Sequence, residues 1–110
     1  MRLAIVGSRN VNNIDIDSYV TNDVTEIVSG GAKGVDSIAA AYAKKKGIIF
    51  TEILPEYKLY GRAAPIVRNR TIVEYADKLI VFWDGRSRGS LYVIKYAKKI
   101  HKDIEVILCT

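Results

Sequence analysis

Short apolar runs alternate with helix-like segments along the chain, and this alternation constrains the fold more than any other feature. The runs are rich in β-branched residues and mostly continuous, as expected of strands that are covered on both faces. They are Leu3 to Val6, Glu26 to Val28, Ile48 to Ile53, Leu79 to Trp83 and Glu105 to Leu108. The pattern therefore predicts about five buried strands.

Helical patterns separate these runs. Apolar residues at helical spacing predict one helix from Val35 to about Ala43 and another around Val93 to Ile100. Pro65 is favourable in a first helical turn and predicts a helix to about Ala76. We also expect a short helix over Asp15 to Asn22, and a long loop from Leu54 to Ala64 that could fold over a ligand.

Alternating strands and helices predict an α/β fold, a three-layer Rossmann-like sandwich of about five parallel strands and four helices. With 110 residues, we expect one domain spanning 1–110 that buries its own core. In such sheets a ligand binds at the carboxyl edge, where the strand order reverses. We expect this switch point between the first and fourth strands.

Cysteine content and hydropathy indicate the compartment. The single cysteine, Cys109, allows no disulfide framework and fits a reducing environment. The apolar run Leu3 to Val6 is too short for a signal-peptide core or a membrane span. We therefore expect a cytoplasmic protein with no membrane partner. Because the lone histidine, His101, lies far from the glycine-bearing loops, we expect no metal site, no histidine triad and no resident cofactor.

The formal net charge of +5 indicates acidic partners, but the distribution of the basic residues is more informative. Lysines gather near the ends of two predicted helices, where they interact favourably with the helix dipole. Arginines instead gather in or next to the loops that follow strands, and their planar guanidinium suits phosphate or carboxylate. These are Arg9, Arg62, Arg68, Arg70, Arg86 and Arg88.

Glycine-bearing loops follow the first, second and fourth predicted strands. They read Gly7-Ser8-Arg9, Ser29-Gly30-Gly31-Ala32-Lys33-Gly34-Val35-Asp36 and Asp84-Gly85-Arg86-Ser87-Arg88-Gly89-Ser90. Glycine lets backbone N–H groups approach a ligand, and each loop leads into a helix N-terminus that favours an anion. The alternative is that the glycines only make tight turns. The spacing matches neither the dinucleotide-binding fingerprint nor a P-loop.

These loops, with Arg68-Asn69, resemble the SLOG superfamily, which includes the Smf/DprA and LOG proteins, and in particular its small stand-alone YspA-like branch. The resemblance covers nearly the whole chain. It implies a Rossmann-like domain that binds nucleotides or nucleotide-derived ligands, and we expect a homo-oligomer. LOG enzymes share a Pro-Gly-Gly-x-Gly-Thr-x-x-Glu motif; here Val93 stands in place of its glutamate, which argues against the LOG reaction.

Three functions are compatible with this sequence. The first is a binding module (a sensor, sponge or carrier) for a mononucleotide or ADP-ribose-like molecule. The second is a hydrolase of a nucleotide N-glycosidic bond, with Asp84 and Glu56 as candidate catalytic residues. The third is binding of single-stranded nucleic acid. The candidate ligand-binding residues are Gly7, Ser8, Arg9, Ser29, Gly30, Gly31, Lys33, Gly34, Asp36, Arg68, Asn69, Gly85, Ser87, Arg88, Gly89 and Ser90.

Three charged residues each have two interpretations. Asp36 either complements the dipole of its helix or contacts a ribose hydroxyl. Asp84 is explained by turn chemistry, or it contributes a carboxylate to the site. Arg68 pairs with Glu74 or Asp77 at the surface, or it serves the ligand or its loop.

Overall fold

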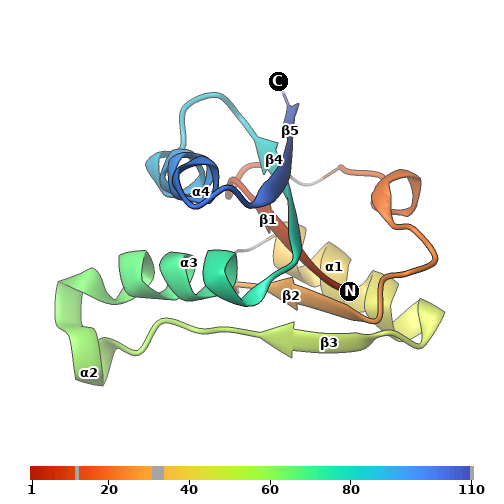
Figure 1. Cartoon of the computed structure of the whole chain (residues 1–110), viewed down its shortest axis with the longest axis horizontal. Helices are drawn as coiled ribbons and strands as arrows, with labels where there is room; N and C mark the ends of the chain where they lie inside the picture. The colour runs from red at the N-terminus through yellow and green to blue at the C-terminus, as the bar shows by residue number, and fades with distance from the viewer. Residues whose placement is uncertain (12, 31–33, 110) are drawn as a thin grey trace.

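Five parallel strands form one sheet in the computed structural model, which describes residues 1–11, 13–30 and 34–109 (Figure 1). The order across the sheet is β3-β2-β1-β4-β5. The strands are β1 (Arg2–Gly7), β2 (Glu26–Ser29), β3 (Ile49–Glu52), β4 (Lys78–Trp83) and β5 (Asp103–Leu108). The predicted α/β, Rossmann-like fold class is therefore confirmed.

Three longer helices connect the strands. They are α1 (Val35–Lys46), α3 (Ala64–Tyr75) and α4 (Arg88–Lys99). The segment predicted as a loop contains a short helix, α2 (Tyr57–Tyr60), followed by a 3-10 turn, η2 (Gly61–Ala63). None of the described helices is long and apolar enough to cross a membrane.

The helix predicted over Asp15 to Asn22 is wrong, because only the 3-10 turn η1 (Asp17–Tyr19) forms there. Ser18 donates its hydroxyl hydrogen to the Asp15 carboxylate at 2.5 Å. Short polar side chains of this kind bond to nearby groups and favour turns over helix interiors. Ile16 is also buried in the core, and Tyr42 of α1 donates to the Asp17 carboxylate at 3.0 Å, so packing and side-chain contacts hold the segment without a helical ladder.

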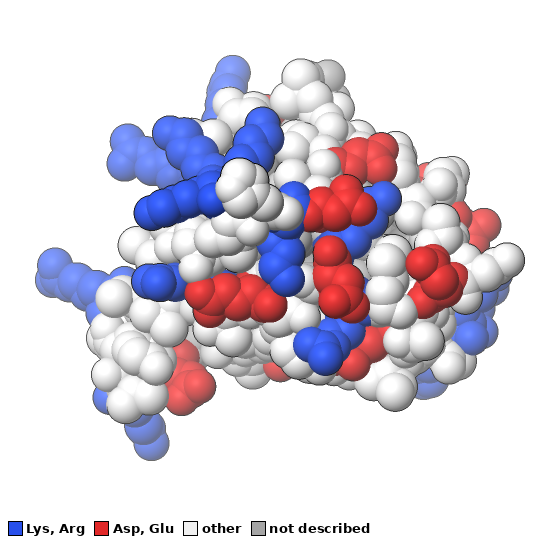
Figure 2. All heavy atoms as spheres, in the orientation of Figure 1, with Lys and Arg blue, Asp and Glu red and all other residues white. Residues whose placement is uncertain are grey.

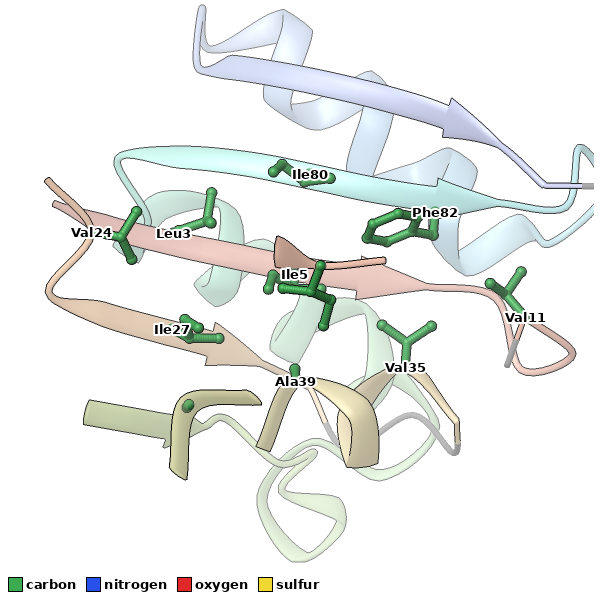
Figure 3. Close-up of a cluster of buried hydrophobic side chains, with 11 residues drawn as sticks. Leu3, Ile5, Val11, Val24, Ile27, Val35, Ala39, Ile80 and Phe82 are labelled. Atoms are coloured by element: carbon green, nitrogen blue, oxygen red, sulfur yellow. The ribbon is translucent and has the colours of Figure 1, made fainter. Parts of the chain in front are cut away.

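The sheet is covered on both faces, which explains why its strand sequences are continuously apolar. Along β1, Leu3 and Ile5 point to the core shared with α1, whereas Ala4 points to the core shared with α3 and α4. Figure 3 shows the first of these cores, where strand side chains gather with Val35 and Ala39 of α1.

The strand order reverses beside β1, as predicted. The chain builds β1, β2 and β3 outward in one direction and then returns to place β4 on the other side of β1. In the register, Gly7 at the end of β1 pairs with Phe82 near the end of β4. The carboxyl ends of β1, β2 and β4 consequently meet at one edge, together with the loops that follow them.

Candidate ligand-binding site

A cavity of about 250 Å³ lies at this edge, between the ends of β1 and β2 and the N-terminal turns of α1, α3 and α4. Many predicted ligand-binding residues line it: Gly7, Arg9, Ser29, Gly30, Arg68, Asn69, Ser87, Gly89 and Ser90. Its walls also include Val6, Val35, Pro65 and Ile72, which sequence reasoning did not assign to the site. The chain therefore brings parts of all three glycine-bearing loops to one hollow.

Two of the glycines allow close approach between elements. A Cβ on Gly7 would lie 2.2 Å from Cγ2 of Val35, so only glycine lets α1 pack against the end of β1. A Cβ on Gly30 would lie 2.9 Å from Cδ1 of Ile72 in α3. Close packing against α1 and α3 therefore explains why both positions are glycine. The same packing brings these helices close to the cavity.

Arg68 connects α3 to the loop after β2. Its guanidinium donates to the backbone carbonyl of Gly30, and its Nε donates to Oδ1 of Asn69 at 2.7 Å. Burial lowers the pKa of this half-buried guanidinium, although arginine stays protonated in proteins. The surface pairing with Glu74 does not form, because Arg70 takes that partner, with its Nε 3.5 Å from the carboxylate. Arg68 is thus a fixed positive charge in the wall of the cavity.

The N-terminus of α4 forms another wall. Ser87 is the N-cap residue, and its hydroxyl accepts from the backbone N–H of Ser90 at 3.5 Å. The first N–H groups of a helix have no partner within the helix, so this end carries a partial positive charge. With Gly89 beside the cap, the backbone is accessible from the cavity.

Asp84 holds the conformation of the loop that leads into α4. Its Oδ1 accepts from the backbone N–H groups of Arg86 and Ser87, each at 2.8 Å. These two hydrogen bonds lower the pKa of Asp84. Asp84 is not among the residues that line the cavity, and its geometry is that of a turn-forming residue.

Ser8 is buried, and its hydroxyl is used within the protein. Its Oγ accepts from the backbone N–H of Asp84 at 3.1 Å and lies 3.4 Å from the Oγ of Ser90. It therefore ties the end of β1 to the loop after β4. Ser8 does not line the cavity, and its buried hydroxyl instead connects residues next to it.

The remaining predicted residues do not line the cavity or lie outside the described residues. Gly34 is the N-cap of α1 with φ 82°, while Gly85 and Arg88 are exposed. Asp36 lies in the first turn of α1, and its hydrogen bond with Glu52 raises the pKa of Glu52. Glu56 lines a second, smaller hollow. Gly31 and Lys33 lie outside the described residues.

Within the described part of the chain, no group of three His, Cys, Asp or Glu side chains could hold a metal ion. The described residues that line the cavity include two arginines and no carboxylate. The arrangement therefore suits an anion held by guanidinium groups and backbone N–H groups.

Comparison with solved structures gives a match to DNA processing protein A (DprA) from Streptococcus pneumoniae, with a TM-score of 0.79 and 23% sequence identity. The match covers 99% of this chain and 50% of that one. The two share a fold. No family model and no curated protein matches. The Rossmann-like fold that the resemblance implies is thus confirmed, whereas membership of the SLOG superfamily and of its YspA-like branch stays a prediction.

Proposed function

We propose that the cavity binds the phosphate and sugar of a nucleotide-derived small molecule, and that the protein acts as a sensor, sponge or carrier of it. The observation that carries this proposal is the meeting of Arg9, Arg68 and the N-terminus of α4 at one hollow. Each of these groups favours an anion, and a phosphate oxygen accepts well from all of them.

The size of the cavity agrees with a small ligand. Small-molecule sites usually enclose about 300–1,000 Å³, and this cavity is slightly smaller at about 250 Å³. Two or three charged hydrogen bonds of about 1.5–3 kcal/mol each, with one base-stacking contact of about 1–3 kcal/mol, reach about 8 kcal/mol in a site that is already formed, which is micromolar affinity. The phosphate and sugar of a mononucleotide or of an ADP-ribose-like molecule fit these limits.

Two measurements test the proposal. Mass spectrometry of the small molecules released on denaturing freshly purified protein should find a nucleotide-derived phosphate. Calorimetry should show that Arg9→Gln weakens binding of 5′-AMP by about 10- to 100-fold, the range expected for one charged hydrogen bond. Arg86→Gln is the matched control, because Arg86 is exposed and does not line the cavity. Equal effects of the two substitutions would overturn the proposal.

A second candidate is nucleic-acid binding. Lysine and arginine side chains gather over α4, which carries Arg88, Lys95, Lys98 and Lys99 (Figure 2). The structural neighbour is named as a DNA processing protein. This candidate predicts binding of single-stranded DNA that weakens steeply with salt and resists competition by 5′-AMP. Competition by the mononucleotide would instead favour the small-molecule site.

The hydrolase alternative has less geometric support. Neither Asp84 nor Glu56 lines the main cavity, and the Asp84 carboxylate accepts from two backbone N–H groups of its own loop. A general acid or base has to reach the proton that it transfers. The two catalytic assignments stay predictions, and the binding proposal does not depend on them.

A further inference from the structure

The short helix α2 carries exposed aromatic and apolar side chains. Tyr57 is 61% exposed, Leu59 65% and Tyr60 43%, and Leu54 just before the helix is 55% exposed. Figure 1 shows α2 standing away from the sheet at the N-terminal end of α3. Single exposed apolar side chains are ordinary, but several together mark a surface that contacts something else.

A small hollow of about 70 Å³ lies between this segment and α3. Leu54, Glu56, Tyr60 and Arg68 are among its lining residues. Arg68 also lines the main cavity, so its side chain lies between the two hollows. Tyr57 also interacts electrostatically with this guanidinium. The interaction partly offsets the lowering of the pKa of Arg68 by burial.

At about 250 Å³ the main cavity is smaller than the usual small-molecule site, so it does not enclose a whole nucleotide. A ligand anchored by its phosphate must therefore extend its base out of the cavity. Past Arg68, the neighbouring surface is that of the α2 tyrosines. Every nucleobase has a π face that stacks on an aromatic ring, and a guanidinium plane can stack in the same way.

We propose that α2 forms the base subsite of this protein, in which the nucleobase of a bound nucleotide stacks on Tyr57 and Tyr60 beyond Arg68. This inference rests on the proposed function, which places the phosphate and sugar in the main cavity. The occupant is the ligand itself, because Arg68 lines both the main cavity and the hollow beside the patch.

A comparison of two ligands tests the subsite. Calorimetry would measure the affinity of 5′-AMP, which has a base, and of ribose 5-phosphate, which has none. The double variant Tyr57→Ala/Tyr60→Ala should weaken 5′-AMP binding by about 5- to 100-fold, the range for loss of base stacking, and leave ribose 5-phosphate binding unchanged. Tyr57→Phe/Tyr60→Phe should bind 5′-AMP as the natural protein does, since the rings remain.

Leu59→Ala is the matched control on the same helix, because Leu59 is equally exposed and lines neither hollow. It should leave both affinities unchanged. If the natural protein binds neither ligand, the proposed function fails and the subsite with it. If it binds both ligands, but the double alanine variant weakens both equally or neither, only the subsite is overturned. A change in oligomeric state without a change in 5′-AMP affinity would also overturn it and mark the patch as a protein interface.

Discussion

A substitution at Gly89 should change the stability of the fold and the binding of a ligand in opposite directions. It lies near the start of α4 and lines the cavity, and a Cβ there would meet its nearest neighbour, Nδ2 of Asn69, at an ordinary 3.7 Å. Alanine favours a helix over glycine by about 1 kcal/mol. We therefore expect Gly89→Ala to raise the free energy of unfolding by up to about 1 kcal/mol, while its methyl group keeps phosphate from the backbone.

Urea unfolding and calorimetry with 5′-AMP would check both effects, and we expect at least a tenfold loss of affinity. Gly7→Ala is a useful contrast, because its Cβ would overlap Val35 at 2.2 Å and the fold itself should be destabilised. Unchanged affinity in Gly89→Ala would mean that the ligand does not approach this backbone.

His101 holds a left-handed conformation just after α4, with φ 60°. The N–H of His101 donates to the carbonyl of Lys98, and the N–H of Lys102 donates to that of Ala97. This conformation costs a side-chain-bearing residue about 1–2 kcal/mol, whereas glycine adopts it freely. Replacing His101 with glycine would remove this cost, but part of the resulting stabilisation is lost because glycine makes the unfolded chain more flexible.

We therefore expect His101→Gly to stabilise the protein by about 0.5–1 kcal/mol in urea unfolding. Its affinity for 5′-AMP should not change, because His101 lies at the other end of α4 from the cavity. A loss of stability would show that contacts of the imidazole outweigh the backbone strain.

The conformation of the loop between β4 and α4 depends on the negative charge of the Asp84 carboxylate. Two backbone N–H groups bond to Asp84 and lower its pKa, so the carboxylate stabilises the fold above the ordinary aspartate pKa of 3.8. This contribution is lost as the pH falls through the lowered pKa of the folded state. Asp84→Asn keeps an acceptor oxygen but removes the charge. The natural protein should therefore be more stable than the variant at neutral pH, and the difference should shrink below about pH 4.

Denaturant unfolding of both proteins across this pH range would check the prediction, and subtracting the two curves cancels the other acidic groups. A difference that is independent of pH would contradict the assignment. The same variant also tests the hydrolase alternative, because a catalytic Asp84 would make turnover of a nucleotide disappear while binding persists.

Strands and helices that are buried along several turns or residues could be predicted from the sequence, and elements of a single turn could not. The strands were recognisable because both faces of the sheet are covered, and α1 because its apolar stripe faces one core. The segment around η1 buries Ile16 in the core but forms a single turn only, and α2 is too short to show a helical period. A four-residue helix has one turn only, so its sequence cannot distinguish it from a loop.

The candidate site shows a similar division. The glycines, serines and arginines of the cavity could be predicted because parallel strands bring their carboxyl ends to one edge. Its apolar wall could not, since Val6 and Ile72 follow the same pattern whether they face a core or a cavity. The internal role of Ser8 depends on contacts with residues more than seventy positions away, and a short loop motif does not contain that information. The turn role of Asp84 depends on neighbouring residues, and turn chemistry was one of its two predicted interpretations.

At the scale of the whole molecule, the cavity is made by many elements at once. The ends of β1 and β2 and the N-terminal turns of α1, α3 and α4 all contribute to its wall. Separation of any one of them would open it. A ligand in the cavity therefore stabilises the assembled sheet and its helices together rather than one loop.

This coupling gives a prediction for the complete chain. A ligand at about 100 times its Kd stabilises the folded state by about 2.7 kcal/mol, which for a domain of 110 residues corresponds to a rise in Tm of about 10 °C. Calorimetric melting with 5′-AMP would measure the rise, and Arg9→Gln at the same ligand concentration should show a smaller one. Hydrogen exchange should slow in β1, β2 and β4 together, because exchange of their central amides requires opening of the sheet. Protection confined to the loop before α4 would mean that the ligand contacts that loop alone and that the cavity is not its site.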